Sequence, residues 1–353
     1  MPRIIGGLFG LQLDPASHMA APAWLGERTV LTASGRSALR TLALFLQPRR
    51  VWLPSYLCAA MLLAFDSAES HVCFYPIDRA LHVQSEDWLG AVSPGDLVVF
   101  VSYFGFATWH EHAVAARRRG AWVVEDACQA MLNEHFDDQA QYVVVSPRKF
   151  VGVPDGGALI AQGDAPLPTT ALAPPPRRWW LQAFAACAGR GEFDRHGGTR
   201  AWFESFQAAE AHTPSSPAAM SEFSQFMLNG QIDLAAIAAA RRSNYEALAR
   251  LLPDLSLFPA LPPHVVPLGF PVRLADRDGI RGKLFQHEIY APTHWPIAHA
   301  VPETFEESQL LSLEILTLPC DQRCDAEDMD RLAALLRAEN ASAPAVRRVA
   351  PPS

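Results

Sequence analysis

The sequence predicts an α/β protein, with a seven-stranded, mostly parallel sheet in a large domain and a small α+β domain toward the C-terminus. Short apolar runs recur through the first half of the chain, with helix-like stretches between them. Several runs are hydrophobic at nearly every position, which is typical of strands that helices cover on both faces. Beyond Pro253 only two strand-like runs remain among helices, which indicates a second, smaller unit.

Seven apolar runs are the expected strands of the large sheet: 28–32, 50–53, 71–77, 96–101, 121–125, 142–145 and 158–161. The stretches 37–46, 109–119 and 232–252 have the apolar spacing of helices, and the first two would supply connections between strands. In sheets of this kind, ligands bind at the carboxyl ends of the strands. The residues that directly follow each run are therefore the first candidates for a functional site.

Changes in composition suggest where the chain divides. Residues 1–27 form an N-terminal segment, and residues 28–252 form the large domain, in which residues 165–230 are an atypical, helical region. Residues 253–341 form the small domain, and residues 342–353 have the composition of a disordered tail. Within the small domain we expect strands at 265–274 and 313–318 and helices at 277–288 and 326–338.

Composition narrows the class of protein. Half of the 353 residues are apolar and 19% are charged, as in an ordinary globular enzyme. The net charge of -8 argues against nucleic acid or an anionic membrane as a partner. No stretch has the apolar length of a membrane span, so we expect a cytoplasmic protein with its six cysteines reduced. Cys320 and Cys324 lack a second ligand pair, so no metal site is expected.

Lysine usage singles out one residue. Of the 29 basic residues, only Lys149 and Lys283 are lysines. Lys149 follows a buried-strand pattern and precedes a Gly-Gly pair. Lysine can lose its proton near neutral pH and form an imine with an aldehyde, whereas arginine stays protonated. Lys149 therefore predicts a covalent chemistry on a carbonyl group.

A second feature lies where the first expected strand meets the first expected helix. There Gly35, Arg36 and Ser37 would place backbone N–H groups, a guanidinium and a hydroxyl at a helix N-terminus. Such an arrangement is a natural phosphate site. Alone, a turn of this composition is more often only a connection.

A third feature is the carboxylate of Asp126, which ends a buried run in the string Glu-Asp-Ala-Cys-Gln. A carboxylate at that depth needs a partner, and a protonated pyridine nitrogen would be one. The plainer interpretation is an aspartate that caps the next helix. Ser146, in Ser-Pro-Arg-Lys, could donate to the same phosphate while Lys149 holds the aldehyde. Gly156 and Gly157 would allow close backbone approach or positive φ.

The three features, each at a strand end and in this chain order, resemble fold-type I pyridoxal-phosphate enzymes. More narrowly, they resemble the DegT/DnrJ/StrS family of sugar aminotransferases. The family's Ser-Gly-Thr-x-Ala-Leu is similar to Ser-Gly-Arg-Ser-Ala-Leu at 34–39, and its Glu-Asp-x-Ala-Gln/His is similar to Glu-Asp-Ala-Cys-Gln at 125–129. Its lysine followed by Gly-Gly is similar to 149–157, and the resemblance covers about residues 28–340.

The resemblance implies pyridoxal 5'-phosphate as the cofactor. Asp126 would pair with its pyridine nitrogen, Gln129 would lie beside the ring, and Lys149 would bind it covalently and act as the base. The implied reaction moves an amino group from glutamate or glutamine to a keto sugar, nucleotide-linked, in polysaccharide or secondary-metabolite biosynthesis. The resemblance also implies a homodimer with sites at the interface.

Departures from the family pattern concern the ring and the phosphate. Arg36 replaces the family's threonine, and Ser-x-x-Lys replaces Ser-Phe-x-x-x-Lys. Cys58 occupies the place of the aromatic residue that stacks on the ring, so Tyr56 or Tyr103 becomes the candidate. The family's Gly-x-Asn-x-Arg stretch, which reaches the neighbouring subunit, has no recognisable counterpart near 221–229.

The substrate is less constrained than the cofactor. His294 and Trp295 lie where the small domain of the family approaches the substrate, which makes them candidate substrate-binding residues. Two alternatives stay open: a non-catalytic regulator or scaffold on the same fold, and amination of a non-sugar ketone. The Ser-x-x-Lys motif of β-lactamases is set aside because its companion motifs are missing. The pair His110 and His112 lacks a third ligand cluster for a metal.

Overall fold

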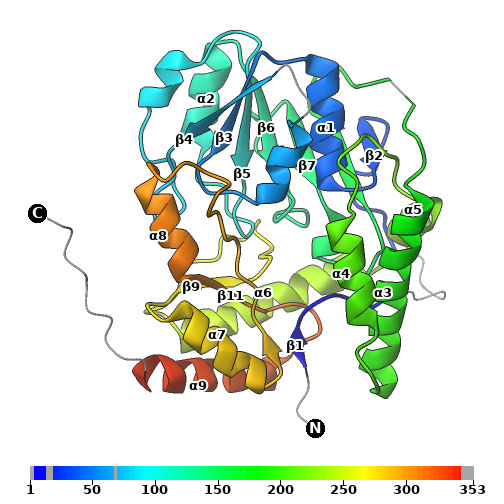
Figure 1. Ribbon diagram of the computed structural model, residues 1–353, viewed down its shortest axis with the longest axis vertical. Helices are drawn as coiled ribbons and strands as arrows, with labels where there is room; N and C mark the ends of the chain where they lie inside the picture. The colour runs from blue at the N-terminus through cyan, green and yellow to red at the C-terminus, as the bar shows by residue number, and fades with distance from the viewer. Residues whose placement is uncertain (1–3, 13–18, 67–69, 170, 343–353) are drawn as a thin grey trace, which may run out of the picture.

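The computed structural model describes residues 4–12, 19–66, 70–169 and 171–342, and it confirms the α/β class (Figure 1). The large sheet has the strand order β2-β8-β7-β6-β5-β3-β4, and all its pairs are parallel except the two that involve β8. Each expected run is a strand, within two residues at either end. The strands are β2 (Thr29–Thr32), β3 (Arg50–Pro54), β4 (His71–Tyr75), β5 (Leu97–Val101), β6 (Trp122–Asp126), β7 (Tyr142–Val145) and β8 (Gly157–Ala161).

Burial of the strands explains why they could be predicted from continuous apolar runs in the sequence. Every residue of β5, β7 and β8 is buried, which requires cover on both faces of the sheet. Helix α1 (Gly35–Leu46) packs on β7 and β8, and helix α2 (His110–Arg118) packs on β6. Short 3₁₀ helices occupy Ala59–Ala64, Asp87–Ala91 and Pro147–Lys149.

The region after β8 is helical, as expected. Helices α3 (Arg177–His196) and α4 (Trp202–Ala211) pack along each other beside the sheet and form a helical hairpin (Figure 1). The indole of Trp179 joins them, because its Nε1 donates to the Ala209 carbonyl at 3.0 Å. Helices α5 (Glu222–Leu228) and α6 (Leu234–Leu251) follow.

A smaller layer lies below the carboxyl edge of the sheet (Figure 1). It contains a two-stranded antiparallel sheet and three helices, namely β9 (Phe270–Arg273), α7 (Arg277–Gln286), α8 (Glu306–Glu314), β11 (Ile315–Leu318) and α9 (Ala326–Ser342). The N-terminal segment joins this layer, since β1 (Ile5–Gly6) pairs in parallel with β10 (Ile289–Tyr290). The expected tail from 343 onward lies outside the described residues.

Two of the expected strands in this layer are shorter than predicted. The strand expected at 265–274 begins at Phe270, because Val266 instead donates its N–H to the Asn133 side chain at 2.9 Å. The strand expected at 313–318 begins at Ile315, because α8 continues through Glu314. All six cysteines are free thiols. Among the described residues, no helix combines the length and apolar character needed to cross a membrane.

Candidate active site

Strand directions bring the three predicted features to one edge of the sheet. Strands β6 and β7 are parallel, and β2 runs the same way because β8 is antiparallel to both β2 and β7. The turn before β8 then touches the start of α1: Ser34 bridges Gly156, whose φ of 140° favours glycine. A Cβ on Gly35 would lie 3.8 Å from the Cβ of Ser146. The helix N-terminus and the lysine loop are therefore neighbours.

The N-terminus of α1 is partly used by protein groups. The Ser34 hydroxyl caps the helix by accepting from the Ser37 N–H at 3.1 Å. The Ser37 hydroxyl donates to the Ser216 carbonyl at 2.9 Å, so it already has an acceptor. Arg36 donates from Nη1 to the Thr213 carbonyl at 2.9 Å, while its buried Nε has no partner among the described residues.

Asp126 is buried at the end of β6. Its Oδ1 accepts from the Cys128 N–H at 2.9 Å, which closes a local turn, and no helix follows, so the helix-cap interpretation is wrong. Gln129 is 1% exposed; its Oε1 accepts from the Phe104 N–H at 2.8 Å. The Gln129 Nε2 is buried and has no partner in the part of the chain that the structure describes. A buried amide donor without an acceptor is costly and calls for a ligand atom.

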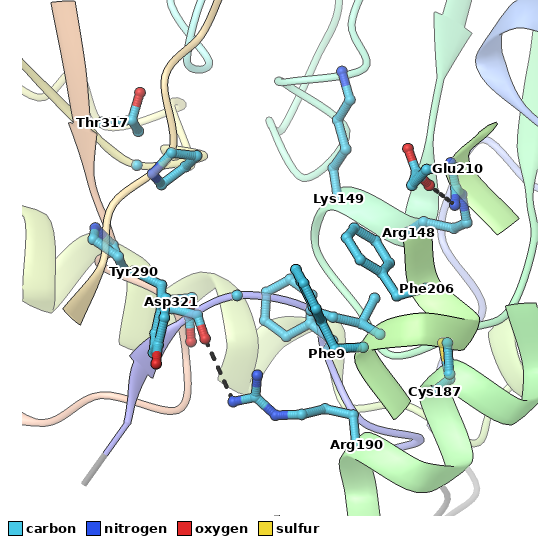
Figure 2. Close-up of a pocket in the computed structure, with 18 of the residues that line it drawn as sticks. Phe9, Arg148, Lys149, Cys187, Arg190, Phe206, Glu210, Tyr290, Thr317 and Asp321 are labelled. Atoms are coloured by element: carbon cyan, nitrogen blue, oxygen red, sulfur yellow. Dashed lines mark hydrogen bonds and ion pairs between the residues drawn. The ribbon is translucent and has the colours of Figure 1, made fainter. Parts of the chain in front are cut away.

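Lys149 ends the short helix Pro147–Lys149 that follows β7. The helix starts at a proline and holds the lysine backbone in place, with the Lys149 N–H donating to the Ser146 carbonyl at 3.2 Å. Its side chain points away from Arg148 into the cavity (Figure 2). No described residue forms a hydrogen bond or ion pair with the Lys149 ammonium, whereas Lys283 pairs with Glu339. The lysine singled out by the sequence is thus the available one.

His294 and Trp295 face the same cavity from the small layer. His294 Nδ1 lies 2.9 Å from the Thr317 hydroxyl. Burial, and next the charge of Lys149, lower the pKa of His294 to about 3, so its imidazole is neutral near pH 7. His294 therefore offers a neutral hydrogen-bonding group opposite Lys149.

The two tyrosines considered as ring-stacking residues are buried behind Trp295 and do not line the cavity. The Tyr56 hydroxyl donates to the His294 carbonyl and accepts from the Trp295 N–H, and the Tyr103 hydroxyl donates to the Tyr56 carbonyl. Their ring centroids lie 5.9 Å apart. In this structure both tyrosines support the loop that carries His294, while Cys58 lines the cavity.

The cavity has a volume of ≈ 700 Å³, within the range of small-molecule sites. The N-terminal segment forms its floor, with Phe9 beneath it, and α4 forms one wall (Figure 2). Its aromatic lining is Phe9, Trp202, Phe203, Phe206, Phe285, Tyr290 and Trp295. Sequence reasoning missed the floor and this wall; the only local signal was the aromatic spacing from Trp202 to Phe206 on one helix face.

Cations and their partners surround the cavity. Arg190 pairs with Asp194 at 2.7 Å, and Arg148 pairs with Glu210 at 2.8 Å. Arg200 pairs with Glu288. The cations that line the cavity are Lys149, Arg148, Arg190, Arg200, Arg241 and Arg281. The carboxylates that line it are Glu210 and Asp321. A positive cavity in a protein of net charge -8 favours an anionic ligand.

The fold is shared with solved structures of aminotransferases. An aminotransferase TlmJ from Streptoalloteichus hindustanus superposes with a TM-score of 0.67 at 16% identity, over 96% of this chain and 99% of that chain. A putative sugar aminotransferase Spr1654 from Streptococcus pneumoniae, in its PLP form, gives a TM-score of 0.65 at 12% identity, over 89% and 87%.

A DegT DnrJ EryC1 StrS aminotransferase from Brucella abortus gives a TM-score of 0.59 at 16% identity, over 88% of this chain and 86% of that chain. No family model and no curated protein matches the sequence. The structural neighbours confirm the predicted likeness in fold to sugar aminotransferases of this type. At identities of 12–16% the likeness to these structures shows the fold alone.

Proposed function

We propose that this protein is a pyridoxal-phosphate-dependent aminotransferase that acts on a keto sugar, nucleotide-linked, with glutamate or glutamine as the amino donor. The observation that carries the proposal is the position of Lys149, whose ammonium faces a cavity and has no partner among the described residues. Structural neighbours of this fold include sugar aminotransferases, one of them in a PLP form.

The residues present fit the cofactor. Gln129 keeps a buried amide donor free for a ligand oxygen, and Asp126 supplies a buried carboxylate for a protonated ring nitrogen. The N-terminus of α1, with Gly35 and Arg36, lies beside Ser146 and suits a phosphate. When bound, pyridoxal phosphate supplies an aldehyde for imine formation and a cationic ring that withdraws electrons.

The chain's own side chains then divide the work. Lys149 would hold the cofactor covalently through Nζ, and with an amino donor bound its Nζ would accept and return the proton that moves on the substrate. Asp126 would keep the ring nitrogen protonated. His294, neutral at working pH, offers a hydrogen bond to the acceptor without adding charge. Trp295 lines the cavity beside His294, where its indole would shield the reacting groups from water.

A second candidate is amination of a non-sugar ketone, favoured by the aromatic wall. Trp202, Phe203 and Phe206 offer apolar faces for stacking rather than hydrogen bonds to sugar hydroxyls. A comparison of half-reaction rates with keto sugars and with aromatic or aliphatic keto compounds decides between the two acceptor classes. By resemblance we also propose a homodimer, which light scattering tests directly.

The first experiment is the visible absorption spectrum of the purified protein before and after borohydride, followed by peptide mapping. We expect a yellow protein and a reduced pyridoxyl adduct on Lys149. The chain offers an internal control, because Lys283 is the one other lysine in the sequence. Addition of glutamate should change the spectrum and release 2-oxoglutarate. A colourless protein that takes up no added pyridoxal phosphate contradicts the proposal and favours the scaffold alternative.

A further inference from the structure

Three charged side chains gather where α4 meets the lysine loop and the start of α1. Arg148 donates from Nη1 to Glu210 Oε1 at 2.8 Å, and Figure 2 shows this pair beside Lys149. Arg36 is the next cation, close enough to both Arg148 and Glu210 to interact electrostatically with each. Arg148 first, and then Arg36 and Lys149, hold the pKa of Glu210 below its ordinary value, so its half-exposed carboxylate is ionised.

The two arginines have more hydrogen-bonding capacity than Glu210 uses. The Nε of Arg36 and the Nε of Arg148 are both buried, and neither has a partner among the described residues. Two buried N–H donors, on cations that flank a helix N-terminus, form a site for an anion with several oxygens. Glu210 satisfies only one arm of one guanidinium.

A phosphate monoester placed between these groups would meet a third charge. Its oxygens would satisfy both free Nε donors, but the ionised Glu210 would repel it. With Glu210 withdrawn, the two positive charges of Arg148 and Arg36 offset the charge of the phosphate, which is roughly -1.5 to -2 at pH 7. With Glu210 in place, the charge of Arg148 is already partly neutralised, so less positive charge faces the phosphate.

The connection of α4 to α3 allows Glu210 to withdraw. Gly197 and Gly198 lie between the helices, with φ of 72° and 104°, and no atom lies within 4 Å of where their Cβ would be. Glycines in this conformation, free of packing, are a natural hinge. Glu210 is near the far end of α4 from that hinge, and its half-exposed carboxylate can leave Arg148 toward solvent when α4 tilts and the neighbouring Trp179–Ala209 hydrogen bond breaks.

We propose that Arg148 and Arg36 bind the cofactor phosphate and that Glu210 is a displaceable counter-ion, released from Arg148 when the phosphate arrives. Helix α4 then acts as a gate that holds the empty site together and shifts when the site is loaded. This inference rests on the proposed function, because it takes pyridoxal phosphate as the ligand. The family pattern described above has no arginine at position 36, so the device belongs to this chain.

The test is a titration of pyridoxal phosphate into the apoprotein, in which the quenching of tryptophan fluorescence measures binding. Removing the competing charge in Glu210→Gln should tighten binding about tenfold, and Arg148→Met should weaken it by at least about tenfold. Glu204→Gln is the matched control, since Glu204 is an exposed acid on the same helix that does not line the cavity. Its affinity should equal that of the wild type.

Hydrogen exchange gives a second readout that a purely structural ion pair would not move. Pyridoxal phosphate should speed amide exchange in α4 of the wild type, and Glu210→Gln should show fast exchange before any addition. Unchanged or weaker binding by Glu210→Gln, or slower exchange in α4 on loading, overturns the gate.

Inorganic phosphate separates the inference from the proposed function. It should bind the wild type, bind more tightly to Glu210→Gln, and bind poorly to Arg148→Met. If no variant gives a borohydride-stable adduct but phosphate follows this order, the proposed function fails and the anion site remains. If adducts form on Lys149 in all variants with equal affinities, the gate alone fails.

Discussion

Gly157 lies directly against Ser34: a Cβ on Gly157 would be 2.2 Å from the Ser34 carbonyl carbon. The first residue of β8 and the cap of α1 therefore touch through their backbones. This contact fixes the helix N-terminus relative to the loop that carries Lys149, so the parts proposed to bind the cofactor covalently and to hold its phosphate are joined at one place. The prediction that the Gly-Gly pair permits close approach is confirmed.

Replacement of Gly157 by alanine should break this junction. The added methyl group has backbone rather than a flexible side chain in its way, so either β8 or α1 must shift, at a cost of about 1–3 kcal/mol in the free energy of unfolding. Urea denaturation measures the loss. Gly26→Ala is the control, because nothing lies within 4 Å of its Cβ position and its stability should hardly change. Equal stabilities of the two variants would contradict the packing argument.

Lys149→Ala should abolish turnover while leaving non-covalent cofactor binding. Asp126 and the phosphate site remain, but the base is gone, so the rate should fall by at least about 10²-fold. Steady-state assay of donor conversion, together with borohydride mapping, checks both parts. Lys283→Ala should keep full activity, since that lysine pairs with Glu339 on the exterior. Transaminase activity retained in Lys149→Ala would refute the role of this lysine.

Protonation of His294 should destabilise the fold in acid. Because the folded-state pKa is lowered to about 3, from 6.5, its contribution to stability is complete above pH 6.5 and is lost as pH falls toward 3. The integrated loss is on the order of 3–5 kcal/mol. His294→Gln keeps a hydrogen-bonding group and should flatten the fall in unfolding free energy between pH 6.5 and pH 4. The same substitution at exposed His287 should leave the profile as it is in the wild type.

Asp321 should contribute to the free energy of unfolding down to a lower pH than His294 does. Burial opposes its ionisation, but Arg323 outweighs burial through charge and hydrogen bonds and lowers the pKa of Asp321 to about 2. Its contribution is therefore present above pH 3.8 and lost as pH falls through 2, about 2 kcal/mol in all. Asp321→Asn should lose at least this amount at pH 7 in urea denaturation. Asp330→Asn, at an exposed position of α9, is the control that should show no loss.

The large sheet could be predicted from the sequence because β5, β7 and β8 are buried along their whole length. β5 and β7 present apolar residues to two covered faces, which leaves a continuous hydrophobic signal. Lys149 and Asp126 were found because one of only two lysines and a carboxylate ending a buried strand are chemically conspicuous. Their roles on the cofactor remain predictions.

Several smaller features have no comparable local signal. The boundary between α8 and β11 was missed because Leu313 is 64% exposed on the helix, yet it reads as the first apolar residue of the strand. The strands β1 and β10 are two residues long and exist only as a pair. The Arg148–Glu210 contact joins residues 62 positions apart, and nothing in the sequence distinguishes that glutamate from others on helix surfaces.

The floor of the cavity has a consequence for synthesis of the chain. Arg323 donates from Nη1 to the Leu8 carbonyl at 2.8 Å, across a separation of 315 residues, and β1 pairs with β10 in the same layer. Residues near position 8 are thus held in place by a residue 315 positions later in the chain. The nascent chain can assemble its central sheet on the ribosome, but it cannot close the cavity until Arg323 has been made. Loading with the proposed cofactor should therefore follow synthesis of that segment.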